Sequence, residues 1–142
     1  MSDQDIELGS GIAAFEGKHF GTAMQLLSPL AEQGHPEAQY RVAIMHQNGL
    51  IGSQNLPEAV RHMRAAAEQG HAMAQHGIGF MYLEGEGLAK DPALAMEWFE
   101  KAAAQGLQGS LTTLGMMYQE GNGVPQDEEK AKAYYRAAGF EM

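Results

Sequence analysis

Cysteine is absent from this 142-residue sequence, and basic residues are scarce. Without cysteine, the chain has neither a disulfide framework nor thiolate ligands for zinc. The sequence has 9 Lys and Arg residues against 18 Asp and Glu residues, which gives a net charge of -9. Because nucleic acids and anionic membrane surfaces attract clustered positive charge, we expect neither as a partner. A protein or peptide partner with a basic patch suits this charge better.

Long hydrophobic runs are also missing. No segment approaches the roughly 20 consecutive apolar residues that a membrane-spanning helix needs. The first residues, MSDQDIELGSGIAAF, carry acids where a secretory signal peptide carries positive charge. These features predict a cytoplasmic protein, although a chain whose signal peptide had been removed would look the same. Apolar residues make up 44% of the sequence, which is enough to build a folded core.

A period of 36 residues runs through the chain. When the stretch 72–107 is shifted by 36 residues in either direction, glycines and alanines fall in register. The clearest sets are Gly34, Gly70 and Gly106; Gly49, Gly85 and Gly121; and Ala59, Ala95 and Ala131. A fixed period of this length is typical of stacked repeat proteins. We therefore predict a single α-solenoid domain over residues 1–142, with units at about 3–35, 36–71, 72–107 and 108–142.

Each unit has the pattern of two antiparallel helices. Apolar residues recur at spacings of three and four, and we find no strand pattern. Asn55, Asp91 and Asp127 precede the second helices as predicted N-caps. Gly79 has no side chain, so a neighbouring helix can approach it closely. The sequence thus predicts eight helices in four pairs.

The third unit carries the densest pattern, Ala74-x3-Ile78-Gly79-x2-Tyr82-x2-Gly85-x-Gly87-Leu88-x2-Asp91-x3-Ala95-x2-Trp98-Phe99-x-Lys101-Ala102-Ala103-x-Gln105-Gly106. This run resembles the Sel-one-like repeat, a longer-loop relative of the tetratricopeptide repeat. Residues 110–138 match almost as well, and residues 38–70 match with departures at His46, Gly52 and His62. The first unit is closer to an ordinary tetratricopeptide pair. The resemblance implies an all-α, right-handed solenoid of helix pairs with a non-catalytic adaptor or scaffold role, often in bacteria.

Catalytic and metal-binding motifs are not evident. The sequence has no cysteine nucleophile and no Gly-x-Ser-x-Gly motif. The six histidines show no HxxxH or HxxE spacing, so we interpret them as structural and expect no metal, no cofactor and no enzyme activity. The turn Gly85-Glu86-Gly87 is interpreted as a loop and not as a phosphate cradle. His46 and His62 lie on the two helices of one pair, where close packing would make them pH-sensitive.

The resemblance implies that the first helix of each pair lines the concave side of the stack. Residues on that helix that are not needed within the pair are candidates for holding a partner segment. They are Tyr40, Ile44, Gln47, His76, Phe80, Leu83, Glu84, Thr112, Met116 and Gln119. Ile44, Phe80 and Met116 form an apolar row, and exposed apolar rows often mark interaction sites. An alternative stays open, in which these residues contact the neighbouring repeat or the first unit.

A second hypothesis concerns the last helix. No polar capping helix follows it in the sequence, although solenoids usually have one. The chain would then form a homodimer or larger assembly through this helix, with Tyr134, Tyr135 and Phe140 as contacts.

Overall fold

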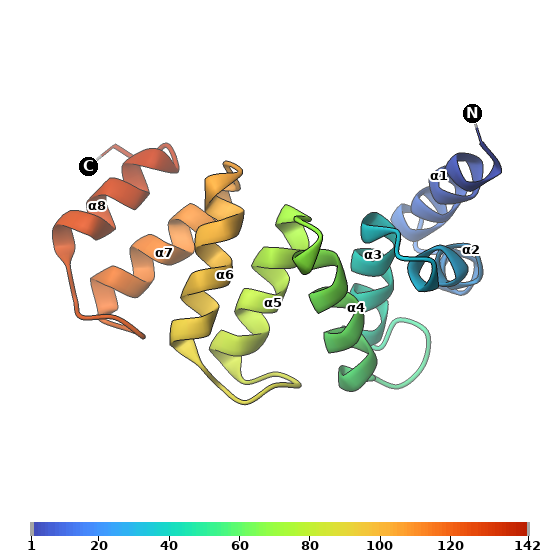
Figure 1. The fold of residues 1–142 in the computed structure, drawn as a ribbon, viewed down its shortest axis with the longest axis horizontal. Helices are drawn as coiled ribbons and strands as arrows, with labels where there is room; N and C mark the ends of the chain where they lie inside the picture. The colour runs from blue at the N-terminus through green and yellow to red at the C-terminus, as the bar shows by residue number, and fades with distance from the viewer. Residues whose placement is uncertain (1, 142) are drawn as a thin grey trace. The chain divides into compact units, whose positions relative to one another are not determined.

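The computed structural model describes residues 2–141, and that range contains eight α-helices and no strand (Figure 1). The helices are α1 (Asp3–Glu16), α2 (Phe20–Glu32), α3 (Pro36–Gln47), α4 (Leu56–Glu68), α5 (Ala72–Glu84), α6 (Pro92–Ala104), α7 (Gln108–Glu120) and α8 (Glu128–Ala137). The prediction of an all-α repeat fold with four helix pairs is therefore confirmed. Residues 1 and 142, the ends of the predicted domain, lie outside the described residues.

The helices fall into two compact units, each containing two pairs. The first unit runs to His71 and holds α1–α4, and the second begins at Ala72 and holds α5–α8. Within each unit, every helix packs against the next one along the chain. None of the helices in residues 2–141 is long and apolar enough to cross a membrane.

The second helices of the last three pairs begin at equivalent caps. The side-chain oxygens of Asn55, Asp91 and Asp127 each accept a hydrogen bond from a backbone N–H three residues later, at 3.2, 3.1 and 3.1 Å. Such a bond satisfies one of the donors that every helix start leaves without a partner. All three predicted caps are thus present.

The connection inside each of these pairs is fixed by the same backbone bonds. The cap N–H groups of Asn55, Asp91 and Asp127 donate to the carbonyls of His46, Tyr82 and Tyr118, each at 2.9 Å. The second pair keeps this bond although it has His46 where the later pairs have tyrosine. Its loop differs mainly in that α3 ends at Gln47, one position earlier in the repeat than α5 and α7 end.

Each unit has its own hydrophobic core. In the first unit the largest fully buried side chains are Leu27, Leu30, Met45, Met63 and Val42, which come from α2, α3 and α4. In the second unit one buried cluster consists of Ala95, Met96, Phe99, Leu114 and Met117, from α6 and α7, and Ile78 and Met81 of α5 are buried as well. Phe80 and Leu83, two residues of the candidate site, pack against this second core.

Candidate functional site

A hollow of about 290 Å³ lies in the second unit, beside α5 and α7. We call it the α5–α7 hollow. It is lined by Phe80, Leu83, Glu84, Lys90, Thr113, Met116, Met117, Glu120 and Asn122. Four of these, Phe80, Leu83, Glu84 and Met116, belong to the predicted partner-binding set. The structure therefore brings together four of the ten predicted residues around one concave surface.

The apolar lining of the hollow is held by the core of the second unit. Phe80 and Leu83 are partly buried and pack against that core. The ring of Phe80 lies edge-on to the buried ring of Phe99, with the centroids 5.1 Å apart. Met116 on α7 is different, because 47% of its surface is exposed. The hollow thus combines two fixed apolar side chains with one exposed methionine, whose flexible thioether adapts to different surfaces.

The charged side chains around the hollow are Glu84, Glu120 and Lys90. All three residues are exposed. Since two acids stand against one base, the rim carries a net negative charge. An incoming segment with a basic side chain would be attracted to it, in line with the charge of the whole chain.

His76 does not line the hollow, but it contacts residues of two successive repeats. Its Nδ1 is 2.7 Å from the Oγ of Ser110 on α7, within hydrogen-bond distance, and Ser110 is completely buried. Its ring also lies edge-on to Phe80, with the centroids 4.9 Å apart. Burial lowers the pKa of His76 below its usual value, so its imidazole is neutral at pH 7. For this residue the structure favours contact with the neighbouring repeat, the alternative that the sequence left open.

Thr112 and Gln119 of the predicted set face other surroundings. The Thr112 hydroxyl donates a hydrogen bond to the carbonyl of Gln108 on its own helix, at 3.0 Å. The Gln119 side chain accepts one from the Tyr135 hydroxyl at 2.7 Å, so it points toward α8. Neither residue lines the α5–α7 hollow.

Tyr40, Ile44 and Gln47 lie on α3 and belong to the first unit. The ring of Tyr40 stacks on His71 with the centroids 4.9 Å apart, and burial raises the pKa of its phenol. Ile44 is partly buried. The backbone carbonyl of Gln47 accepts a hydrogen bond from the Gln54 side chain at 2.8 Å. A role for these three residues in binding stays a prediction.

Five residues of the hollow were absent from the predicted set, namely Lys90, Thr113, Met117, Glu120 and Asn122. On α7, positions 113, 116, 117 and 120 are spaced by three, one and three, which places them on one helical face. This spacing was a usable signal for Thr113 and Met117. Glu120 lies 36 residues after the predicted Glu84, so the period of the repeat already places it on the same face. Lys90 and Asn122 come from the loops after α5 and α7, and no periodic pattern would find them.

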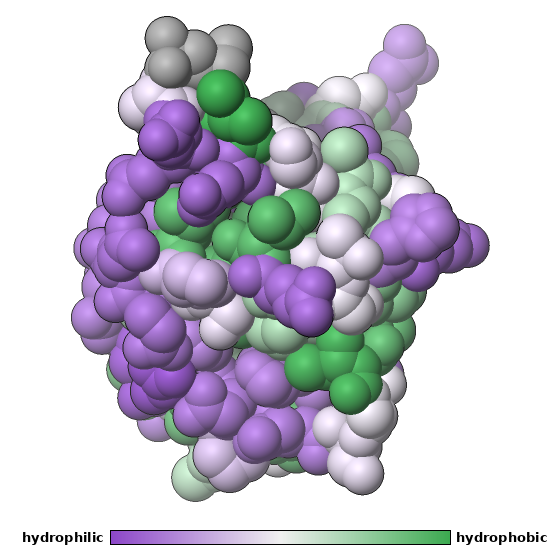
Figure 2. All heavy atoms as spheres, turned by 90° about the vertical axis from the view of Figure 1, so that its right-hand side faces the viewer, coloured by the Kyte–Doolittle hydropathy of each residue, from purple (hydrophilic) through white to green (hydrophobic). Residues whose placement is uncertain are grey.

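The first unit presents its exposed hydrophobic side chains singly. Figure 2 shows one of its faces, where hydrophobic side chains are scattered among hydrophilic ones. Among the described residues of this unit, 2–71, the large exposed hydrophobic ones are Ile6 and Ile51. Isolated apolar residues are normal on protein surfaces, so this face suggests no docking site.

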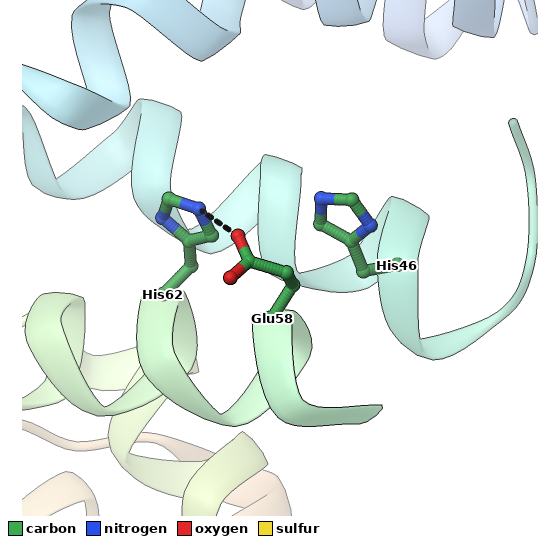
Figure 3. Close-up of side chains that lie close together, drawn as sticks. All are labelled: His46, Glu58 and His62. Atoms are coloured by element: carbon green, nitrogen blue, oxygen red, sulfur yellow. Dashed lines mark ion pairs between the residues drawn. The ribbon is translucent and has the colours of Figure 1, made fainter. Parts of the chain in front are cut away.

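One group of side chains in residues 2–141 has the composition and proximity to hold a metal ion. It consists of His46 on α3 and of Glu58 and His62 on α4, whose donor atoms all lie within 4.8 Å of one another. Figure 3 shows the three side chains meeting in the space between the two helices. His46 and His62 were paired from the sequence, but Glu58 was not predicted. The signal for Glu58 was its position one helical turn before His62, on the same helical face.

Comparisons with known proteins agree with the repeat period. The Sel1 repeat matches residues 36–71, 72–107 and 111–139. Several solved structures are similar, including the following two. One is a protective antigen of uropathogenic Escherichia coli strains that displays an SLR fold, with 36% identity, a TM-score of 0.78 and 81% of this chain covered. The other is a Sel1 repeat protein from Oxalobacter formigenes, with 31% identity, a TM-score of 0.86 and 92% of this chain covered.

Both of these proteins are longer. The matched region is 25% of the Escherichia coli chain and 54% of the Oxalobacter formigenes chain. This chain thus spans about a quarter of one and about half of the other. None of the curated proteins matches the chain significantly.

Proposed function

This chain belongs to the Sel1 repeat family, and from that premise we propose that it holds a segment of a partner protein in the α5–α7 hollow. Sel1 repeat proteins are generally non-catalytic modules for protein–protein interaction. The observation that carries the proposal is the gathering of Phe80, Leu83, Glu84 and Met116 around one concave surface. The partner contributes an apolar side chain that enters the hollow and a nearby Lys or Arg.

The apolar part of this binding mode rests on Met116. A hollow of about 290 Å³ is at the lower end of the volumes that hold small ligands, roughly 300–1,000 Å³. One large side chain of a peptide therefore fills it. Because Met116 is 47% exposed, covering it removes apolar surface from water without any rearrangement of the core.

The charged part rests on Glu84 and Glu120. Both carboxylates are exposed, so their contribution to affinity is modest and depends on salt. Their main effects are on the association rate and on the choice of partner. A peptide with Lys or Arg beside its apolar anchor is therefore favoured over one with Asp or Glu there.

Selection of peptides from a displayed random library on the purified chain tests this proposal. We expect selected peptides to share an aromatic or aliphatic residue with Lys or Arg close to it. Met116→Asp should abolish their binding and leave the helical circular dichroism spectrum unchanged. Phe80 is a poorer choice for this test, because its contact with Phe99 makes Phe80→Asp a folding variant as well.

Leu94→Asp is the matched control. Leu94 is an exposed hydrophobic residue of the second unit, on α6, and it does not line the hollow. Peptides should bind Leu94→Asp as they bind the wild type. The proposal would be contradicted if the peptides bound Met116→Asp as well as the wild type. It would also be contradicted if Met116→Asp and Leu94→Asp lost peptide binding to the same extent.

A second candidate function is self-assembly through α8. The observation that favours it is an apolar hollow of about 390 Å³ on α7 and α8, which includes Tyr118 and Tyr134. The rings of Tyr118 and Tyr134 stack with the centroids 5.7 Å apart, and Phe140 beyond α8 is 51% exposed. A second copy covering this face would give a dimeric mass by light scattering. Tyr134→Glu should convert that dimer to a monomer, whereas a monomeric wild type would exclude this function.

A further inference from the structure

The first unit holds a group of side chains that repeat packing leaves unexplained. His46 lies near the end of α3, and Glu58 and His62 lie one turn apart on α4 (Figure 3). The two imidazole rings are nearly parallel, at 9°, with centroids 6.2 Å apart. The His62 side chain is only 4% exposed, while Glu58 is 37% exposed at its side chain. The group is therefore anchored in the helix pair and open at one side.

The spacing of the donor atoms suits a small metal ion. All three donors lie within 4.8 Å of one another, and the Nε2 of His62 is already 3.5 Å from the Oε2 of Glu58. Around a tetrahedral zinc ion with bonds of about 2.1 Å, two donors lie about 3.4 Å apart. The His62–Glu58 pair already has nearly that spacing. Glu32 lies nearby, with its Oε1 3.7 Å from the Nε2 of His62, but it is not part of the group whose donors all lie within 4.8 Å of one another.

A positively charged side chain, that of Arg61, already contacts two members of this group. The NH2 nitrogen of the Arg61 guanidinium lies 2.8 Å from a carboxylate oxygen of Glu58, 2.8 Å from one of Glu32 and 3.1 Å from the Nε2 of His62. Glu58 and His62, two of the three groups that would bind a metal ion, thus already contact a guanidinium. Because the Arg61 side chain is 52% exposed, it can leave without disturbing the core.

We propose that His46, Glu58 and His62 form a site for a divalent transition-metal ion, which takes the place of the Arg61 guanidinium. Imidazole ligands, of which this group has two, suit Zn²⁺, Ni²⁺ and Cu²⁺, whereas Mg²⁺ and Ca²⁺ prefer sites made of oxygen ligands alone. Arg61 acts as a competing cation that keeps the two carboxylates paired when metal is scarce. The site lies within the first unit and is independent of the proposed peptide binding in the second.

Titration of the untagged purified chain with Zn²⁺ in a calorimeter tests this proposal. We expect one ion to bind per chain. His46→Gln should weaken binding by about tenfold or more, because even the outer-shell residues of metal sites contribute 10–100-fold. Arg61→Gln should tighten it, because the competing cation is gone. His71→Gln is the matched control, since His71 also lies beside a carboxylate of the first unit, 2.6 Å from Glu37; it should bind Zn²⁺ like the wild type.

The melting temperature with and without Zn²⁺ is a second measurement, and it tests the proposal even if a variant is less stable than the wild type. Excess Zn²⁺ should raise the melting temperature of the wild type, because a ligand that binds only the folded state stabilises it. It should not do so for His46→Gln or Glu58→Gln. The proposal is overturned if binding is not saturable, if His46→Gln binds like the wild type, or if Arg61→Gln binds more weakly.

Discussion

Gly79 and Phe99 approach each other so closely that a Cβ on Gly79 would lie 2.7 Å from the Cε1 of Phe99. Real Cβ contacts are essentially never this short. Gly79 is on α5 and Phe99 on α6, so this contact sets how closely the two helices of the third pair pack. The same relationship recurs 36 residues later, where a Cβ on Gly115 would lie 2.8 Å from the Cε1 of Tyr135.

The first prediction concerns Gly79→Ala. Phe99 is fully buried and cannot move aside, so we expect this variant to lose about 1–3 kcal/mol of unfolding free energy, as overpacked cores do. Urea denaturation measures the loss. Gly109→Ala is the control in the same unit, because its new Cβ would be 3.5 Å from His76, an ordinary contact. A stabilised Gly79→Ala would contradict the close packing described here.

The second prediction concerns the helix caps. Asp91→Ala should destabilise the second unit by about 1 kcal/mol, because the N–H of Leu94 loses its acceptor at the start of α6. Asp91→Asn should retain most of the stability, since its side-chain oxygen can accept the same bond. Thermal unfolding compares the two variants. Equal stability of the alanine and asparagine variants would show that the cap contributes nothing.

The third prediction concerns pH. Burial lowers the pKa of His76 in the folded chain, whereas in the unfolded chain it is near the ordinary value of about 6.5. The unfolded state therefore binds the proton more readily, so His76 lowers the stability as the pH falls below about 6.5. Above that pH its neutral form adds no such penalty.

The measurement is the unfolding free energy between pH 5 and 8 for the wild type and for His76→Gln. The difference between the two should change as the pH falls, with the variant losing less stability than the wild type. Taking this difference cancels the contributions of the other titrating groups. A constant difference over the whole range would mean that His76 titrates normally in the folded chain.

The sequence predicted the fold well because the features that define it are local. The caps at Asn55, Asp91 and Asp127 depend on residues three positions away, and the 36-residue period repeats them. The close approach at Gly79 was also predicted, because a glycine on the packing face of a helix leaves room for a neighbouring helix to come close.

The site was predicted only in part, because it depends on which side of each helix faces the hollow. Thr112 was predicted, but Thr113 lines the hollow, and one position along a helix is a rotation of about 100°. Lys90 comes from a loop whose path no periodicity describes. Glu58 was missed for a similar reason, since its proximity to His46 follows from how α3 and α4 pack and not from sequence spacing alone.

The central claim, that a partner segment enters the α5–α7 hollow, is tested most directly by methyl NMR. The chain has ten methionines, and Met116 and Met117 line the hollow, while Met96 belongs to the core of the same unit and Met45 to that of the first. When a library-selected peptide is added to chain labelled at the methionine methyl groups, the Met116 and Met117 signals should shift and the Met45 signal should stay in place. Binding that leaves the Met116 and Met117 signals unchanged would contradict the account.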